Sequence, residues 1–162
     1  MGCVSTVDLQ TKMEVHELLS RFCHYLDHDK TSEWSHLFTA DAVVDGGHIG
    51  IYEGRPEIAQ ITAKIGQLGK GFWRHHLSNV MFERTGHPRE LEINAYCLTT
   101  DWSKEGALVH CADFRAILKN RCHWQLHNLV LTPVAEACMQ RAAGDVPHGR
   151  ADALPGPASL LN

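Results

Sequence analysis

The spacing of apolar residues changes once along this chain, and that change limits the folds open to it. Before about residue 70, apolar residues recur every three to four positions, which indicates amphipathic helices. From residue 72 to residue 131 they alternate with polar residues, which indicates strands in a half-buried sheet. The sequence therefore predicts an α+β fold, in which helices pack on one face of a curved antiparallel sheet and form a cone with an apolar pocket.

Glycine, proline and capping residues divide these two regions into elements. Helices are expected at residues 7–27 or 11–27, from residue 31, and at residues 54–68. Thr11 and Glu14 are spaced as in a capping box, which would begin the first helix. A short hairpin is expected at residues 41–45 and 48–52, and four longer strands at residues 72–83, 89–100, 107–119 and 122–131.

The length and the composition suggest one domain with a tail. A chain of 162 residues is large enough for a single core, which we expect over residues 7–134. Residues 135–162 are rich in Ala, Gly and Pro, so this tail is expected to be irregular or disordered, or to fold over the mouth of the pocket.

Charge and cysteine content indicate which cell compartment and which classes of partner to expect. The chain has 19 acidic and 15 Lys and Arg residues and no basic block, so nucleic acid is not an expected partner. It shows neither the apolar region of a signal peptide nor an apolar run of roughly 18 residues that could span a membrane. Six cysteines without a CxxC pair are typical of free thiols in a reducing compartment. We therefore expect a cytoplasmic protein.

Twelve histidines raise the question of a metal, but their spacing does not support one. His24 and His28 would share a helix face, yet no HExxH motif or cysteine pair completes a site. His123 and His127 lie on a predicted strand, where four residues span about 13 Å. The chain also lacks GxGxxG and GxxxxGK phosphate-binding motifs. The sequence therefore predicts neither a metal nor a cofactor.

Asp27 and His75 form the strongest candidate for catalysis. Asp27 ends the first helix, where a carboxylate is electrostatically disfavoured unless it has a specific partner. His75 begins the first long strand, and alternation turns it to the opposite face from His76. We expect Asp27 to bond one imidazole nitrogen, so that the other nitrogen serves as a general base in an apolar cavity.

Several motifs in a fixed order resemble one known family. They are Tyr25-Leu26-Asp27, Trp34-x-x-Leu37-Phe38, Asp41 to Asp45, Tyr52 to Ile58, Arg74 to Asn79, and Trp124-x-Leu126. Over roughly residues 10–131 this pattern resembles the SnoaL-like branch of the nuclear transport factor 2-like superfamily, which has a cystatin-like fold. The resemblance to scytalone dehydratase and hexachlorocyclohexane dehydrochlorinase implies that His75 removes a proton while Asp27 supports it.

The resemblance implies a cofactor-independent lyase (dehydratase-like), isomerase or cyclase. Its substrate would be a small hydrophobic carbonyl-bearing molecule of secondary metabolism, such as a polyketide. One departure is Tyr96-Cys97, which stands where a second pocket histidine would be expected. His110, Tyr25 and Asn79 are candidates to polarise the substrate oxygen. Trp34 and Trp73 are candidates for the pocket wall.

Two alternatives remain open at this stage. The first is a non-catalytic binding or accessory subunit, similar to the β subunit of a ring-hydroxylating dioxygenase. The second is a hydrolase of the limonene epoxide type, which would need an Asp–Arg–Asp arrangement drawn from Arg74, Arg115, Asp101 and Asp113. For any of these functions, we expect a homodimer or homotrimer formed through the outer face of the sheet.

Overall fold

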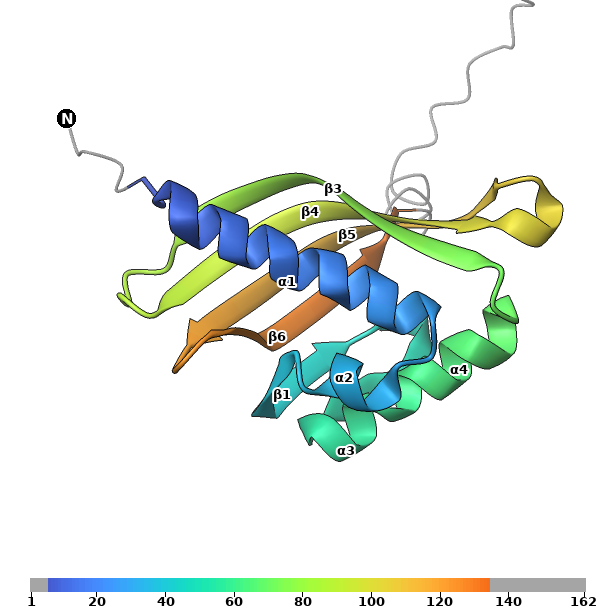
Figure 1. Ribbon diagram of the computed structural model, residues 1–162, viewed down its shortest axis with the longest axis horizontal. Helices are drawn as coiled ribbons and strands as arrows, with labels where there is room; N and C mark the ends of the chain where they lie inside the picture. The colour runs from blue at the N-terminus through green and yellow to red at the C-terminus, as the bar shows by residue number, and fades with distance from the viewer. Residues whose placement is uncertain (1–5, 135–162) are drawn as a thin grey trace, which may run out of the picture.

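The computed structural model describes residues 6–134, so the tail predicted at residues 135–162 lies outside the described residues. Its helices are α1 (Leu9–Asp27), α2 (Thr31–Ser35), α3 (Gly54–Ile58) and α4 (Gln60–Gly69), with short 3-10 turns at Gly47–Ile49 and Trp102–Lys104. Its strands are β1 (Phe38–Asp45), β2 (Ile51–Glu53), β3 (Trp73–Arg84), β4 (Glu90–Asp101), β5 (Ala107–Asn120) and β6 (Trp124–Pro133). The predicted order of helices and strands is thus confirmed (Figure 1).

The six strands form one sheet in the order β2-β1-β6-β5-β4-β3. Its neighbours pair antiparallel except β1 and β6, which are parallel. The prediction of a wholly antiparallel sheet is therefore wrong at this one pair. The reason is that β1 precedes the meander in sequence, and its place in the order depends on a long-range pairing with β6 that no local pattern encodes.

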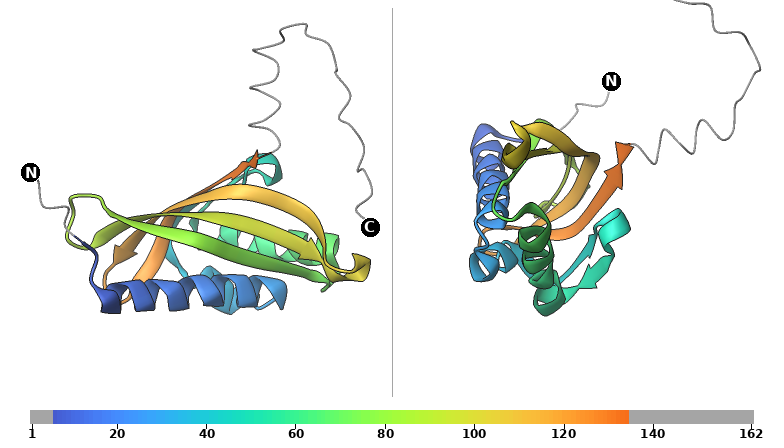
Figure 2. Two further views of the ribbon diagram at one scale, coloured as in Figure 1. Left: turned by 90° about the horizontal axis from the view of Figure 1, so that it is seen from above. Right: turned by 90° about the vertical axis from the view of Figure 1, so that its right-hand side faces the viewer.

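The sheet is strongly curved, and α1 lies along its inner face (Figure 2). Val15, Leu18, Phe22 and Leu26 form the buried stripe of α1, at the three- and four-residue spacing that the sequence predicts. Inner-face residues of the strands complete the core, and they include the fully buried Ile93, Phe114, Leu118 and Leu126. None of the helices in the described part of the chain is long and apolar enough to cross a membrane.

Two local details differ from the sequence prediction. The cap of α1 is Asp8, whose carboxylate accepts the Thr11 backbone N–H at 2.9 Å, so the predicted capping box of Thr11 and Glu14 is wrong. An Asp accepts that bond without help from a second side chain. The third predicted helix is divided into α3 and α4 at Ala59, which nevertheless keeps helical backbone angles.

Candidate active site

Asp27 and His75 meet where the last residue of α1 passes the beginning of β3. Nδ1 of His75 lies 2.6 Å from Oδ1 of Asp27, and the His75 backbone N–H donates to both carboxylate oxygens at 3.2 and 3.0 Å. Both side chains are buried, with 8% of His75 and 5% of Asp27 exposed. Because a carboxylate can only accept, Nδ1 carries the imidazole proton and Nε2 keeps its lone pair. The structure thus orients one imidazole nitrogen as a potential base.

A buried thiol lies on the same face of α1 as the carboxylate. Cys23 precedes Asp27 by four residues, one helical turn, and its thiol hydrogen-bonds the backbone of Leu77 on β3. Burial, with smaller contributions from Cys97 and Asp27, raises the pKa of Cys23 to about 12. Burial likewise raises the pKa of Cys97, which lies opposite Leu77 on β4, to about 12. Both thiols are therefore neutral neighbours of the couple at physiological pH.

A row of polar side chains continues from His75 across the inner face of the sheet. Thr99 of β4 lies opposite His75, and His110 of β5 lies opposite Thr99. Thr99 is only 3% exposed, and the His110 ring makes an edge contact with His48 at a centroid distance of 5.4 Å. Two strand spacings separate His75 from His110, about 10 Å, so the two rings share the face without touching.

The other predicted site residues divide between neighbours of the couple and the core. Trp73 hydrogen-bonds Asp101 and borders a hollow of about 10 Å³ that Asp27 also lines. Trp34 is 1% exposed and packs against Phe22 and Phe38. Trp34 is therefore a core residue, and the prediction that it forms a pocket wall is not supported.

Tyr25 is half-buried and lies on a different face of α1 from Asp27. Two residues turn an α-helix by about 200°, so their side chains diverge. The Tyr25 ring instead lies under the ammonium group of Lys30, 5.6 Å from the ring centroid. Its backbone carbonyl accepts the Lys30 N–H at 2.9 Å, where the chain leaves α1. Its predicted position beside the substrate oxygen is not supported by this geometry.

Asn79 does not share the face of His75, so the structure does not support its predicted role at the substrate oxygen. A β-bulge between Ser78 and Met81 adds a residue to β3, and Asn79 takes a left-handed backbone conformation with φ of 55°. Alternation is therefore reversed beyond the bulge, and Val80 packs against the core while Asn79 is exposed. A pattern of alternating residue types does not reveal such an insertion.

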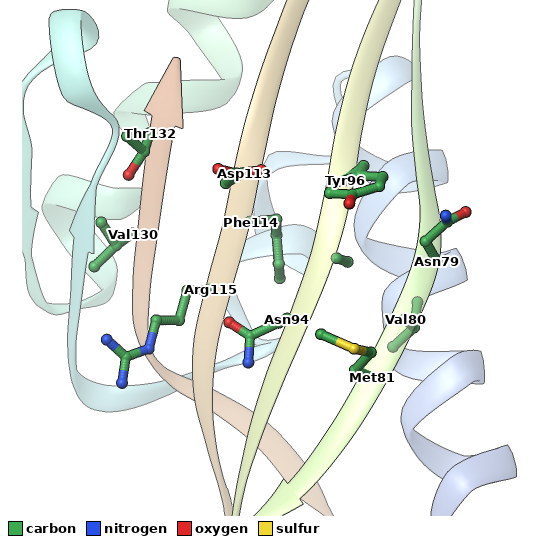
Figure 3. Close-up of a pocket in the computed structure, with 11 residues that line it drawn as sticks. Asn79, Val80, Met81, Asn94, Tyr96, Asp113, Phe114, Arg115, Val130 and Thr132 are labelled. Atoms are coloured by element: carbon green, nitrogen blue, oxygen red, sulfur yellow. The ribbon is translucent and has the colours of Figure 1, made fainter. Parts of the chain in front are cut away.

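Asn79 instead borders a wide groove of about 790 Å³ on the outer face of the sheet. Figure 3 views this groove with the strands in front and the helices behind them. The exposed residues Met81 and Tyr96 lie in this groove, together with Asp113 and Arg115. The largest of the described hollows is thus separated from Asp27 and His75 by the sheet itself.

The hollows that reach the couple are smaller. His75 lines a groove of about 240 Å³ between α1 and the edge strand β3, whereas Asp27 lines the 10 Å³ hollow near Trp73. Sequence reasoning missed this groove, which is lined by His16, Leu19, Ser20, Cys23, His24, His75, His76, Leu77 and Val80. The spacing of its α1 residues at positions 16, 20, 23 and 24 is the signal that could have identified the helix face.

The structure does not bring together the Asp–Arg–Asp set considered for epoxide hydrolysis. Arg115 lies on the outer face and binds Glu92 at 2.6 and 3.1 Å, while Asp101 is buried and accepts the Ser103 hydroxyl at 2.6 Å. Arg74 donates to the carbonyls of Gly71 and Trp73. Among residues 6–134 there is no group of three or more His, Cys, Asp or Glu side chains placed to hold a metal ion.

Comparison with known proteins gives a family and a fold. The profile of the SnoaL-like domain matches residues 7–128. No curated protein matches the chain significantly in sequence.

Solved structures of the cystatin-like and NTF2-like fold match most of the chain. A candidate scytalone dehydratase from Novosphingobium aromaticivorans is 18% identical with a TM-score of 0.67, over 77% of this chain and 85% of that one. ActVI-ORFA from Streptomyces coelicolor is 16% identical with a TM-score of 0.65, over 75% and 96%. A Catenulispora acidiphila protein in complex with S-DNPA is 16% identical with a TM-score of 0.67, over 82% and 99%. At these identities the likeness establishes the fold alone.

Proposed function

This chain belongs to the SnoaL-like domain family, and we propose that it is a cofactor-independent acid/base enzyme. Its substrate would be a small carbonyl-bearing molecule that undergoes elimination, isomerisation or cyclisation. The observation that carries this proposal is the 2.6 Å bond between Asp27 and Nδ1 of His75, made by two buried side chains. Similarity to structures that include a candidate scytalone dehydratase is consistent with such chemistry.

In this mechanism Nε2 of His75 takes a proton from the carbon beside the substrate carbonyl. The imidazole then carries a positive charge, which the Asp27 carboxylate stabilises through Nδ1–H. Burial strengthens that interaction because little water screens it. The negative charge that develops on the substrate oxygen needs a donor, and His110 is the candidate on the same sheet face. In an elimination, the electron pair left on carbon expels the leaving group.

Proton exchange tests this proposal without knowledge of the product. A panel of small ketones and hydroxyketones would be incubated with the protein in D2O, and NMR would follow deuterium entering beside the carbonyl. His75→Gln should abolish catalysed exchange. His36→Gln is the matched control, because His36 is exposed, lies outside the groove of His75, and bonds the Ser32 carbonyl at 2.7 Å. Equal exchange by wild type and His75→Gln would refute the mechanism.

A second candidate is a non-catalytic binding or accessory subunit, and the outer groove favours it. A hollow of about 790 Å³ with exposed Met81 and Tyr96 is suited to an interface, either in the homodimer or homotrimer expected from the sequence or with a larger subunit. Light scattering of the wild type and of Tyr96→Lys tests this: loss of a dimer, trimer or heteromer in the variant supports the interface. A wild-type monomer without a co-purifying subunit contradicts it.

A further inference from the structure

The groove between α1 and β3 borders His75 at the edge of the sheet. We call it the histidine groove, with the nine lining residues given above. It lies along β3, which is an edge strand of the sheet. Its volume of about 240 Å³ is below the roughly 300–1,000 Å³ of typical drug-sized sites, so it suits a small molecule.

The chemistry of this groove is distinctive because its lining holds four imidazoles and neither Asp nor Glu. His16, His24 and His76 are exposed, and each ring is oriented by a neighbour. His16 contacts the edge of Phe82 at 5.3 Å, His24 stacks on His28 at 6.2 Å, and His76 bonds Thr100. In a chain of net charge −4, this absence of lining carboxylates makes the groove suited to an anion.

Two cationic side chains lie on the elements that form the groove, although they do not line it. On α1 the ammonium of Lys12 lies 5.8 Å from the centroid of the Phe82 ring that His16 also contacts, and on β3 the guanidinium of Arg74 is held by main-chain carbonyls. The carboxylate behind the groove is Asp27, which already accepts two N–H groups from His75. Cys23 is neutral, because burial raises its pKa to about 12.

The geometry points to the histidine groove as a binding site for a small carboxylate- or phenolate-bearing molecule, which reaches His75 from the side of α1. This inference rests on the proposed function, because it names the substrate class of the same base. Asp27 holds Nδ1, so Nε2 is the ring nitrogen of this lining residue that is left for a substrate. The anionic group would contact His16, His24 or His76 while the acidic carbon lies at Nε2.

Binding can be tested by NMR on the full chain with ¹⁵N-labelled histidines. Benzoate serves as the anionic probe, and benzyl alcohol as the neutral probe of similar size. We expect benzoate to shift His75 together with the exposed groove imidazoles, and to bind at least tenfold more tightly than benzyl alcohol.

Ser20→Phe should block the probe, because Ser20 lies on the α1 side of the groove and is exposed. His24→Gln removes one groove imidazole without adding bulk, so it should weaken benzoate binding even if Ser20→Phe disturbs α1. His123→Gln is the matched control, since His123 lines a different groove. Benzoate that fails to bind, that leaves His75 unshifted, or that binds equally to Ser20→Phe would overturn the inference.

The binding and exchange experiments together distinguish a failure of the groove proposal from a failure of the proposed function. Benzoate binding that shifts His75, in a protein that never exchanges deuterium, would support the groove and count against the proposed function. His75-dependent exchange that is unchanged in a folded Ser20→Phe protein would support the function and overturn the groove as its entrance.

Discussion

Replacement of Asp27 by Asn should change which imidazole nitrogen of His75 carries the proton. The carboxylate now accepts both the His75 backbone N–H and Nδ1–H. An Asn side chain has one accepting oxygen and one donating NH₂ group. If the oxygen keeps the backbone N–H, the NH₂ faces Nδ1, which must then accept. The proton is thereby moved to Nε2, and the base is lost.

The structure also gives the size of the stability change. In Asp27→Asn every donor keeps an acceptor, and one charge-assisted bond of about 1.5–3 kcal/mol becomes a neutral bond of about 0.5–1.5 kcal/mol. The free energy of unfolding should therefore fall by only about 1–2 kcal/mol. Asp27→Ala leaves two buried N–H groups without that acceptor, at about 1–3 kcal/mol each, so it should cost about 2–6 kcal/mol. Catalysed exchange should drop about 10²–10⁴-fold in both variants.

Long-range ¹H–¹⁵N correlation spectra identify the tautomer of His75, and urea unfolding gives the stability of each variant. His36→Gln is again the control, because His36 lies outside the groove of His75. A protein with Asp27→Asn in which Nδ1 of His75 still carries the proton would refute the reasoning. So would a loss of stability as large as that of Asp27→Ala, because the amide would then not have replaced the carboxylate.

Three further predictions concern the surroundings of the site. Unfolding exposes Cys23 and Cys97, and the pKa of each thiol then falls from about 12 to the usual 9.0. Above pH 9 the unfolded chain loses these protons before the folded chain does. The free energy of unfolding should therefore fall above pH 9, by up to about 1.4 kcal/mol per pH unit for each thiol. Urea unfolding between pH 8 and pH 10 measures this, and a Cys97→Ala protein with an equally steep decline would contradict it. Gly69→Ala would place a Cβ 2.6 Å from Cγ of Trp73, so it should lower the free energy of unfolding by about 1–3 kcal/mol and change the tryptophan fluorescence. Gly71→Ala has open space around its Cβ and should strain only the backbone. Identical fluorescence spectra for the two variants would count against the contact with Trp73. Phe114→Ala should lower the free energy of unfolding in urea by about 3–5 kcal/mol, because Phe114 is 1% exposed. Arg115→Met breaks an exposed ion pair with Glu92 and should lower it by less than about 1 kcal/mol. Similar losses in the two variants would show that the core is assigned wrongly.

The sequence predicts the parts of this fold that depend on short-range periodicity. The stripe on α1 and the alternation along β4 are confirmed because each follows from residues three, four or two positions apart. The contact of Asp27 with His75 joins residues 48 positions apart, and the resemblance to a known family, not local periodicity, is what predicts it. The parallel pairing of β1 with β6 could not be predicted from local periodicity either, because it joins segments about 90 residues apart.

Local backbone geometry accounts for most of the errors at the site. The bulge in β3 turns Asn79 to the outer face; asparagine tolerates the left-handed backbone that the bulge requires, but an asparagine alone does not predict a bulge. The motif Tyr25-Leu26-Asp27 suggests that Tyr25 shares the site of Asp27, although helix geometry separates side chains two residues apart. The volumes of the hollows depend on how side chains fill the space between α1 and the sheet, which a one-dimensional pattern does not contain.

The bond between Asp27 and His75 serves the fold and the chemistry through different atoms. The His75 backbone N–H donates to the carboxylate and thereby joins the end of α1 to the start of β3, which offsets the cost of an anion at the negative end of a helix. An Asn side chain at position 27 could make that connection without charge. The imidazole bond has no such structural substitute, because only a full acceptor keeps the proton on Nδ1 and leaves Nε2 basic. A stability loss that is small in Asp27→Asn, beside an activity loss that is large, would therefore show that the charge is retained for the reaction.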